Sequence, residues 1–592
     1  MYRPSFPTRV AARLGRAVDH RFGWDRLPLP LGLLALLGIR EDLRLNNLHD
    51  TYRGEPPTPP PDGWLRDGRT VDGSFTDPAA ATMGMVMTRF GRNVPIDGAT
   101  PEPPSTLLVP NPRTVSDRLL LRTEFKPATT LNVLAAAWLQ FETRDWFSHE
   151  SDTTRPILLP RPPGDDWPED PMRLPSTAND PTAVVAGGRT ATHLNTETHW
   201  WDASQVYGSR IEFQQSVRTG AGGRLRVGSD GLIDVDPSLL GSSGGADGFW
   251  LGLELMHTLF MREHNSICER LERAYPEWTD ERLFQKARII NAALLAKIHT
   301  VEWTPAILGH PTLQVGMRAN WWGIAGERVH RLLGRHGRGD VLFGIPGSRT
   351  EQHAAPYSIT EDFVSVYRMH PLMPDDYDLW DVRTGLPLER LEFVSLHGLG
   401  SRDVIQRVGA ANAFYSLGLA NPGAVTLHNS PRFMHRLRRT DGVFVDVTAL
   451  DVLRSRERGV PRYAEFRRRL HMTPLRSFDD FAVDASTREE LRSVYDDDLE
   501  KIDLTVGMLG ERLPRGFGFS DTAFRIFILM ASRRLKSDRF FTVDFTPEMY
   551  TPEGMAWLDD NTMSTVLVRH YPELAPALEG ARNAFAPWVR VR

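Results

Sequence analysis

The chain is poor in cysteine, because its 592 residues include only Cys268. A single cysteine excludes an internal disulfide and any metal centre built from several thiolates, and we expect Cys268 to be a small buried side chain. The low cysteine content fits a reducing compartment. The basic N-terminal stretch has no apolar core followed by a cleavage site, so we expect no signal peptide and a cytoplasmic protein.

Strong positive charge and long apolar runs are also missing. The formal net charge of −5 argues against a nucleic-acid binder, because binding phosphates requires concentrated positive charge. The apolar run at 27–39, LPLPLGLLALLGI, is too short to span a bilayer, which takes about 20 residues. It fits either an interfacial helix at a substrate entrance, with peripheral membrane contact, or a buried helix with proline at its start. The arginines that precede it include Arg3, Arg9, Arg13 and Arg16, and Arg40 and Arg44 follow it.

Several common catalytic motifs are absent from the sequence. The chain has no H-E-x-x-H and no C-x-x-C, which argues against zinc hydrolase chemistry. It has no G-x-x-x-x-G-K-[ST] either, so a phosphate-binding loop of that kind is excluded.

The composition is that of an ordinary globular protein, with 41% hydrophobic and 24% charged residues. Residues 51–113 are rich in Pro, Gly and Asp, which predicts an extended arm instead of an independent domain. We therefore divide the chain into an N-terminal segment, 1–113, with the short apolar helix and this arm, and one large domain, 114–592.

Helical periodicity dominates the large domain, and strands with alternating polarity are scarce. The predicted fold class is therefore mainly α, with a single large domain and little β structure. Asp280 is a candidate N-cap for one of the helices. The predicted helical stretches are a region from about 129, then 249–275, 281–308, 410–419, 430–439, 463–471 and 521–535.

The stretch 358–375, SITEDFVSVYRMHPLMPD, is unusual in its chemistry. Ser358 and Glu361 form an S-x-x-E capping box, which predicts a helix start, and Pro371 ends the pattern. Tyr367 and His370 then lie one turn apart on one buried face, with Cβ atoms roughly 5–6 Å apart. The pair fits either a core tyrosine beside a satisfied histidine or a redox-active phenol beside an imidazole.

A second stretch, THWWDASQVYGS, gathers hard oxygen atoms in one short loop. Thr198, Asp202 and Ser204 offer side-chain oxygens, and Trp200 can add its carbonyl. Calcium takes about 6–8 oxygen ligands that include carboxylates. The loop is therefore a candidate calcium site, although loops of this pattern are also common structural turns.

Five uncommon words occur in the order found in the animal-type haem peroxidases: WLQFETRDW, THWWDASQVYGS, LFMREHNSICERLERAYPEW, AKIHTVEWTPAIL and VYRMHPLMPD. The chain most resembles the fatty-acid α-dioxygenases, and it resembles the cyclooxygenases less closely. The likeness runs from about residue 22 to about residue 572. It implies that 114–592 is a haem-peroxidase-like catalytic domain.

The resemblance implies a role for each matching residue. His370 is expected to ligate a haem iron, Asn429 to orient its imidazole, and Tyr367 to form the radical that takes hydrogen from the substrate. Relatives that attach haem covalently use carboxylates where this chain has Thr143 and Trp250, so the haem is expected to be a non-covalent haem b. The residues implied to contact haem are Arg454, Arg458 and His149.

The resemblance also implies a metal site and a substrate site. Asp145 is expected to complete the calcium ligands Thr198, Trp200, Asp202 and Ser204. His299 and Arg534, with Arg533 as the alternative to Arg534, are expected to hold the carboxylate of a long-chain acid, and the other reactant is O2 or peroxide.

One departure from the family pattern affects peroxide activation. The family has Q-x-x-x-H-D, whereas this chain reads Gln140-Phe-Glu-Thr-Arg144-Asp145, so Arg144 replaces the distal histidine. Asp247 stands where the family has a distal arginine. Peroxide activation needs a base that accepts a proton; arginine has no acceptor, but a carboxylate does.

Three interpretations follow from this departure. In the first, the chain is an α-dioxygenase-like enzyme that adds O2 to a fatty acid or similar acid, with Asp247 as acid/base and Arg144 as charge stabiliser. In the second, it is a haem oxidoreductase with altered chemistry or another substrate. In the third, it is a haem-binding protein whose distal side is blocked by an Arg144–Asp247 ion pair.

Overall fold

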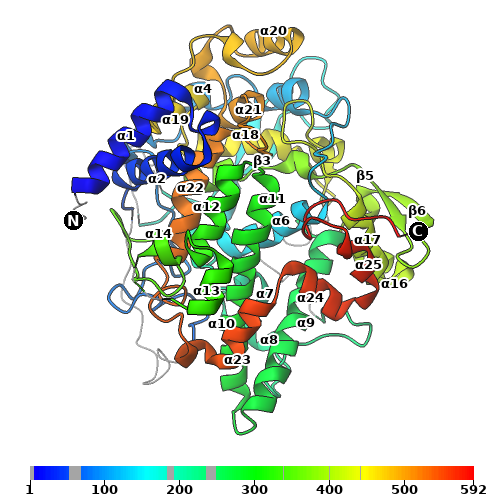
Figure 1. The fold of residues 1–592 in the computed structure, drawn as a ribbon. Coiled ribbons are helices and arrows are strands. Elements are labelled where there is room, and N and C mark those ends of the chain that lie inside the picture. The colour runs from blue at the N-terminus through cyan, green and yellow to red at the C-terminus, as the bar shows by residue number, and fades with distance from the viewer. Residues whose placement is uncertain are drawn as a thin grey trace.

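Helices form most of the protein (Figure 1), so the predicted mainly α fold class is confirmed. The structure is a computed structural model that describes residues 6–51, 68–182, 192–234 and 248–591, apart from residues 336, 338, 399, 440 and 441. The longer helices are α1 (Phe6–Phe22), α2 (Leu29–Asn46), α6 (Leu134–Trp146), α9 (Leu251–Ala274), α10 (Asp280–Ile298), α12 (Pro311–Trp322), α17 (Ala410–Leu419), α18 (Val447–Glu457), α20 (Ala485–Val494), α22 (Asp521–Lys536) and α23 (Pro547–Asp560).

Shorter helices and a few strands connect these elements. Within the described ranges, paired strands occur as four antiparallel two-stranded sheets: β1 (Thr88–Arg89) with β4 (Leu194–Asn195), β2 (Ser151–Leu159) with β3 (Met172–Thr177), β5 (Asp376–Trp380) with β6 (Pro387–Glu392), and β7 (Leu437–Arg438) with β8 (Phe444–Val445). The shorter helices are α4 (Pro104–Leu107), α5 (Pro112–Val115), α7 (Ser204–Tyr207), α8 (Ile211–Ser216), α11 (Thr304–Ile307), α13 (Glu327–Leu333), α14 (Asp340–Phe343), α15 (Glu361–Val366), α16 (Gly400–Val408), α19 (Tyr463–Arg469), α21 (Leu504–Gly510), α24 (Met563–His570) and α25 (Ala575–Glu579).

Helices α9 and α10 pack side by side in the lower half of Figure 1. The N-cap of α10 is Thr279, whose hydroxyl accepts from the Arg282 N–H, so the prediction of Asp280 was wrong by one residue. The predicted helix 281–308 is interrupted by a π-helical turn at His299–Trp303. Pro305 follows it and cannot donate a backbone hydrogen bond, which prevents a regular α-helical ladder there.

The helix that carries Tyr367 is shorter than predicted. Ile359 accepts a hydrogen bond from the Gly91 N–H in an extended segment, so α15 starts later and Thr360 caps it. The capping box at Ser358 and Glu361 was therefore wrong. Likewise, the predicted helix at 430–439 is a 3-10 turn, Arg432–Arg436, followed by β7.

One hydrophobic cluster runs from Trp24 near the N-terminus to Trp588 near the C-terminus. It includes residues of α2, α6, α9, α10 and α22, so the N-terminal helices contribute to the same core as the rest of the chain. The division at residue 113 stays a prediction, and the stretch 52–67 of the predicted arm lies outside the described residues. Among the helices that the structure describes, none combines the length and the apolar character needed to cross a membrane.

Candidate active site

A cavity of about 550 Å³ lies beside Tyr367 and His370. This volume falls in the range of roughly 300–1,000 Å³ that ligand and cofactor sites occupy. Its wall is largely apolar, with polar groups from α6 and α18 at the edges. The lining includes Leu139, Gln140, Thr143, Trp250, Met369, Phe393, Phe433, Leu450 and Arg454.

Tyr367 stands at the C-terminal end of α15 and is 7% exposed. Its ring packs edge-on against Trp146, with centroids 5.3 Å apart, and lies 4.4 Å from Phe363. Burial raises the pKa of Tyr367 well above its ordinary value, although the Arg534 charge opposes this. The phenol therefore keeps its hydrogen at neutral pH.

His370 begins a 3-10 turn, His370–Leu372, three residues after Tyr367. The two side chains are thus not on one continuous helix, but both line the same cavity. His370 Nδ1 lies 2.5 Å from a carboxylate oxygen of Asp451, which also pairs with Arg368. Burial alone would raise the pKa of Asp451, but His370 and Arg368 hold it below its ordinary value. With the carboxylate next to Nδ1, Nε2 is the ring nitrogen that is available for a metal.

Asn429 does not take the place predicted for it beside His370. Its side-chain oxygen accepts from Arg122 Nε at 3.0 Å, and its amide donates to the carbonyls of Lys126 and Ala424 at 2.9 and 2.7 Å. Both amide atoms are thereby committed to the loop around Arg122. Asp451 is the residue that faces the imidazole, so this prediction is corrected.

Of the three residues predicted to contact haem, Arg454 lines the cavity. The other two belong to a separate buried cluster. Arg458 Nε donates to Thr177 Oγ1 at 3.1 Å, and burial lowers the pKa of Arg458 to about 9. His149 Nε2 lies 3.0 Å from both carboxylate oxygens of Glu361, and burial lowers the pKa of His149 to about 3. Both side chains therefore have partners within the protein, and their contact with haem stays a prediction.

On the opposite wall, Gln140 reaches the cavity from α6. Its amide donates to the Gly248 carbonyl at 3.1 Å and its oxygen accepts from Trp250 Nε1 at 2.7 Å. Arg144, one helical turn further, is buried behind this wall with its guanidinium carbon 5.8 Å from the centre of the Phe249 ring. Burial lowers the pKa of Arg144 to about 10, and Asp247 lies outside the described residues.

The predicted substrate residue His299 sits in the π-helical turn and is buried among indole rings. Trp138 Nε1 donates to its Nδ1 at 3.2 Å, and Trp303 stacks on it at 4.6 Å. Burial and the nearby Arg534 charge lower the pKa of His299 well below its ordinary value. Since Nδ1 accepts, the neutral ring carries its hydrogen on Nε2 and can donate to an anion.

Arg534 and Arg533 of α22 point to different environments. Arg534 lies over the rings of Trp146 and Trp201, at 4.5 and 4.7 Å, and its Nε and Nη1 are buried without a hydrogen-bond partner. Arg533 instead donates to three backbone carbonyls, those of Gln352, Ala355 and Pro356. The geometry therefore selects Arg534 over Arg533 as the cation beside His299.

Burial raises the pKa of two carboxyl groups near Arg534. Burial raises the pKa of Glu142 to about 8, although Trp201 Nε1 donates to it at 2.9 Å. Burial and the neighbouring Asp202 raise the pKa of Asp145 well above its ordinary value. Asp145 lies 3.7 Å from the Arg534 guanidinium.

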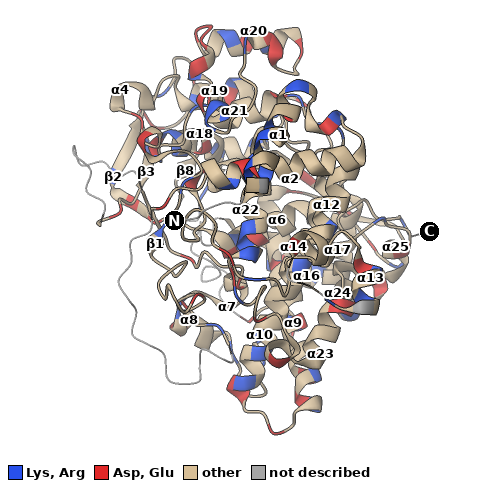
Figure 2. Ribbon diagram, turned by 60° about the vertical axis from the view of Figure 1, so that its left-hand side comes forward, with Lys and Arg blue, Asp and Glu red and all other residues tan. Residues whose placement is uncertain are grey.

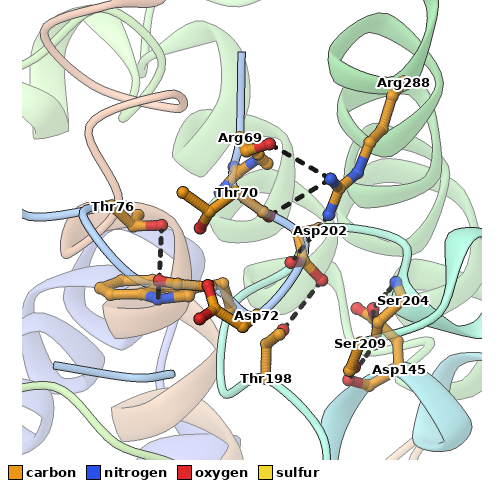
Figure 3. Close-up of polar contacts among 12 residues, drawn as sticks. Arg69, Thr70, Asp72, Thr76, Asp145, Thr198, Asp202, Ser204, Ser209 and Arg288 are labelled. Atoms are coloured by element: carbon orange, nitrogen blue, oxygen red, sulfur yellow. Dashed lines mark hydrogen bonds and ion pairs between the residues drawn. The ribbon is translucent and has the colours of Figure 1, made fainter. Parts of the chain in front are cut away.

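Four of the five predicted calcium ligands, Asp145, Thr198, Asp202 and Ser204, lie close to one another (Figure 3). Asp145 accepts from the backbone N–H and the hydroxyl of Ser204 at 2.6 and 3.0 Å, and Thr198 donates to Asp202 at 2.9 Å. The second oxygen of Asp145 is buried without a hydrogen-bond partner, and the Trp200 carbonyl accepts from Arg534 at 3.4 Å. Hard oxygen atoms with two carboxylates fit calcium.

Sequence reasoning missed two residues of the site. Trp146 lies between Tyr367 and His299, with ring centroids 5.3 and 5.2 Å away. Asp451 precedes Arg454 by three residues on α18, so helical spacing could have placed both on the cavity side. For Trp146 the signal was only its position after Asp145.

The sequence profile of the family described as animal haem peroxidase matches residues 68–585. The chain belongs to this family. It is 37% identical to alpha-dioxygenase PIOX of Oryza sativa subsp. japonica over 99% of this chain and 96% of that protein, and 37% identical to alpha-dioxygenase PIOX of Nicotiana tabacum over 96% and 90%. The predicted relationship to the α-dioxygenases, which are oxidoreductases, is confirmed, and haem is implied by the family.

A solved structure agrees over the whole length. The crystal structure of a tyrosine-to-phenylalanine variant of Oryza sativa fatty acid alpha-dioxygenase with palmitic acid matches with a TM-score of 0.91 and 36% identity, covering 99% of this chain and 98% of that one.

Proposed function

We propose that the protein is a haem-dependent α-dioxygenase that adds O2 to the carbon next to the carboxylate of a long-chain fatty acid. The observation that carries this proposal is Arg534, a buried cation with two unpartnered nitrogen atoms, separated from Tyr367 by one indole ring. A planar guanidinium is suited to a carboxylate. The relative crystallised with palmitic acid supports the choice of acid.

Haem b fits the residues around the cavity. His370 would hold the iron through Nε2, because Nδ1 faces Asp451, and Arg454 would pair with a propionate. Thr143 and Trp250 line the cavity, and neither is a carboxylate that could form an ester with haem, which supports a haem held without a covalent link. When bound, haem supplies the one-electron oxidant that a buried phenol requires.

Residues of the chain bind the substrate and carry out the hydrogen-atom transfers. Arg534 and the Nε2–H of His299 hold the carboxylate, which positions the neighbouring carbon near Tyr367. Oxidised Tyr367, having lost one electron and one proton, takes a hydrogen atom from that carbon. O2 adds to the carbon radical, and the peroxyl radical regains a hydrogen atom from Tyr367, giving the 2-hydroperoxy acid. Trp146 and its neighbours exclude water from these steps.

Peroxide activation is assigned to Asp247 as acid/base, with Arg144 as charge stabiliser. The support is chemical: Arg144 has no acceptor atom, whereas a carboxylate can receive and return a proton. Gly248, the residue after Asp247, lines the cavity. Asp247→Asn is expected to slow the reaction of ferric protein with hydrogen peroxide by about 100-fold. Stopped-flow traces that match those of the unmodified protein would rule this role out.

Calcium is the second cofactor that we propose, held by Asp145, Asp202, Thr198, Ser204 and the Trp200 carbonyl. The unpartnered buried oxygen of Asp145 supports it. Because burial raises the pKa of Asp145, binding of the cation would displace a proton from this group.

The decisive test of the proposal is Tyr367→Phe. The variant is expected to bind haem with an unchanged Soret band but to lose oxygen uptake with a long-chain acid by at least about a thousandfold, because phenylalanine cannot give up a hydrogen atom. Tyr377→Phe is the matched control, since this tyrosine is also buried and its ring lies 5.9 Å from Trp250. Full uptake in Tyr367→Phe would favour altered chemistry, and no uptake in the unmodified haem protein would favour a haem-binding protein.

A further inference from the structure

The N-terminal helices α1 and α2 form a hairpin on one side of the molecule (Figures 1 and 2). Their backbones touch at Gly15 and Gly38, where a Cβ on Gly15 would lie 2.6 Å from the Gly38 Cα atom. The hairpin is anchored to α22, because Trp24 Nε1 donates to Asp521 at 3.0 Å and Arg525 pairs with Asp19 at 2.8 Å. Its orientation on the core is therefore fixed.

The face of the hairpin that points away from the core is apolar. Phe6, Val10 and Leu14 follow one another at four-residue steps on α1, which aligns them in one stripe. Phe6 is 79% exposed and Leu14 is 60% exposed, and on α2 Leu34 is 64% exposed. Soluble surfaces carry scattered apolar side chains, but a contiguous stripe on an anchored helix marks an interaction site.

A basic edge runs along this stripe. Arg9 and Arg13 are exposed and lie one helical turn apart on α1, next to Val10 and Leu14 in sequence. Neither has an ion-pair partner among the described residues, whereas Arg16 is 3.8 Å from Asp42. Figure 2 shows basic residues on α1. An apolar stripe with a cationic edge is complementary to an anionic lipid surface, which attracts the arginines and accepts the apolar side chains.

A small apolar cavity of about 70 Å³ lies beneath the hairpin, between α2, α12 and α22. Leu36 of α2 and Phe527 of α22 are both part of its wall. The Phe527 ring lies 6.4 Å from the ring of Tyr367. One aromatic side chain thus separates the space under the hairpin from the candidate radical residue.

We propose that the outer face of the α1–α2 hairpin docks on an anionic phospholipid surface, so that a long-chain acid enters under α2 from the lipid. The part concerning the acid rests on the proposed function. The hairpin lies in the interface with Phe6, Leu14 and Leu34 among the acyl chains and Arg9 and Arg13 at the headgroups. This arrangement is peripheral and spans no bilayer.

The test is sedimentation of the full-length haem protein with vesicles of phosphatidylcholine, with and without phosphatidylglycerol. The protein is expected to sediment with the anionic vesicles at low salt and to be released at high salt, because exposed charges are screened. The double variant Leu14→Glu/Leu34→Glu is expected to bind at least about tenfold more weakly. Arg9→Gln/Arg13→Gln is expected to lose roughly tenfold, and only in the presence of phosphatidylglycerol.

Leu386→Glu is the matched control, because this leucine is 62% exposed in the β5–β6 turn and its substitution is expected to leave binding unchanged. Failure of the unmodified protein to sediment with anionic vesicles would overturn the proposal. So would a dimer in analytical ultracentrifugation that Leu14→Glu/Leu34→Glu dissociates without any vesicle binding, since the stripe would then join two copies.

Oxygen uptake with a short, water-soluble acid separates this inference from the proposed function. The hairpin variants are expected to keep that uptake, because their substitutions are remote from Tyr367. Vesicle binding without any oxygen uptake would leave docking intact and refute the enzyme assignment.

Discussion

The two sides of Tyr367 differ in how they are filled. Towards His370 lies a cavity of about 550 Å³ with a largely apolar wall. Towards His299 and Arg534 the space is packed with the rings of Trp146, Trp201 and their neighbours. The first side contains a cavity that a flat cofactor can fill. The second side contains a buried guanidinium group packed between aromatic rings.

On the packed side, the guanidinium of Arg534 lies 3.7 Å from a carboxylate oxygen of Asp145. Burial raises the pKa of Glu142 to about 8 and holds the pKa of Asp145 well above its ordinary value. His299 is neutral. Indole faces stabilise the cation in part, and a substrate carboxylate would complete the site that we propose here. We therefore propose that the cofactor binds on the open side, towards His370, and that the anion binds on the packed side, towards Arg534.

Of the substitutions that test this difference between the two sides, Arg534→Gln is expected to have the largest effect. A hydrogen bond to a charged group contributes about 1.5–3 kcal/mol, so kcat/KM for a long-chain acid is expected to fall about 10- to 100-fold in oxygen-uptake assays. The unmodified enzyme is expected to prefer the acid over its methyl ester, and Arg534→Gln is expected to lose most of that preference.

Arg533→Gln is the natural control because it neighbours Arg534 on α22 and holds three backbone carbonyls. It is expected to lower the unfolding temperature and to keep the preference for acid over ester. If both variants lost the preference equally, the packed side would not be selective for the anion.

A smaller effect is expected from calcium, which would join the packed side through Asp145. That carboxyl lies 3.7 Å from Arg534 and accepts hydrogen bonds from Ser204. Calcium at a hundred times its dissociation constant would stabilise the fold by about 2.7 kcal/mol. The unfolding temperature is therefore expected to fall by a few degrees when EGTA replaces calcium.

Asp202→Asn is expected to abolish the calcium dependence while haem binding stays normal. An unfolding temperature that is identical in EGTA and calcium would remove the metal from the proposal.

Much of this architecture could be predicted from the sequence, and the misses have identifiable causes. α17 has the predicted bounds and α22 ends one residue later than predicted. Both predictions succeeded because the apolar periodicity that indicates a helix lies within the residues of the helix itself. The start of α15 was wrong because Gly91, far away in sequence, holds the preceding segment extended. A local capping motif does not reveal such a tertiary contact.

The predictions for the candidate site were also partly right and partly wrong. His299 and Arg534 were predicted from words of matching sequence, and the structure brings both against Trp146. The prediction for Asn429 was wrong because Arg122 engages its amide. Asp451 was missed, although its spacing of three residues from Arg454 on α18 could have placed it on the cavity side. Contacts between side chains of different helices depend on tertiary packing, which cannot be read from a single sequence.

The smallest effect concerns the neutral carboxyl group Glu142 on the packed side. Burial raises its pKa from 4.5 to about 8, so above pH 4.5 the folded chain keeps a proton that the unfolded chain has lost. Its stabilising contribution is complete below that pH and decreases as the pH rises towards 8.

Glu142→Gln retains an acceptor for Trp201 without a titrating proton. We therefore expect the unfolding free energy of the variant, relative to that of the unmodified protein, to increase with pH. The expected increase between pH 5 and 8, measured by urea denaturation, is up to about 1.4 kcal/mol per pH unit. Glu277→Gln, at an exposed position, is expected to show no such trend. Parallel pH profiles for Glu142→Gln and the unmodified protein would mean that Glu142 is ionised, and Arg534 would then already have an anionic neighbour before any substrate arrives.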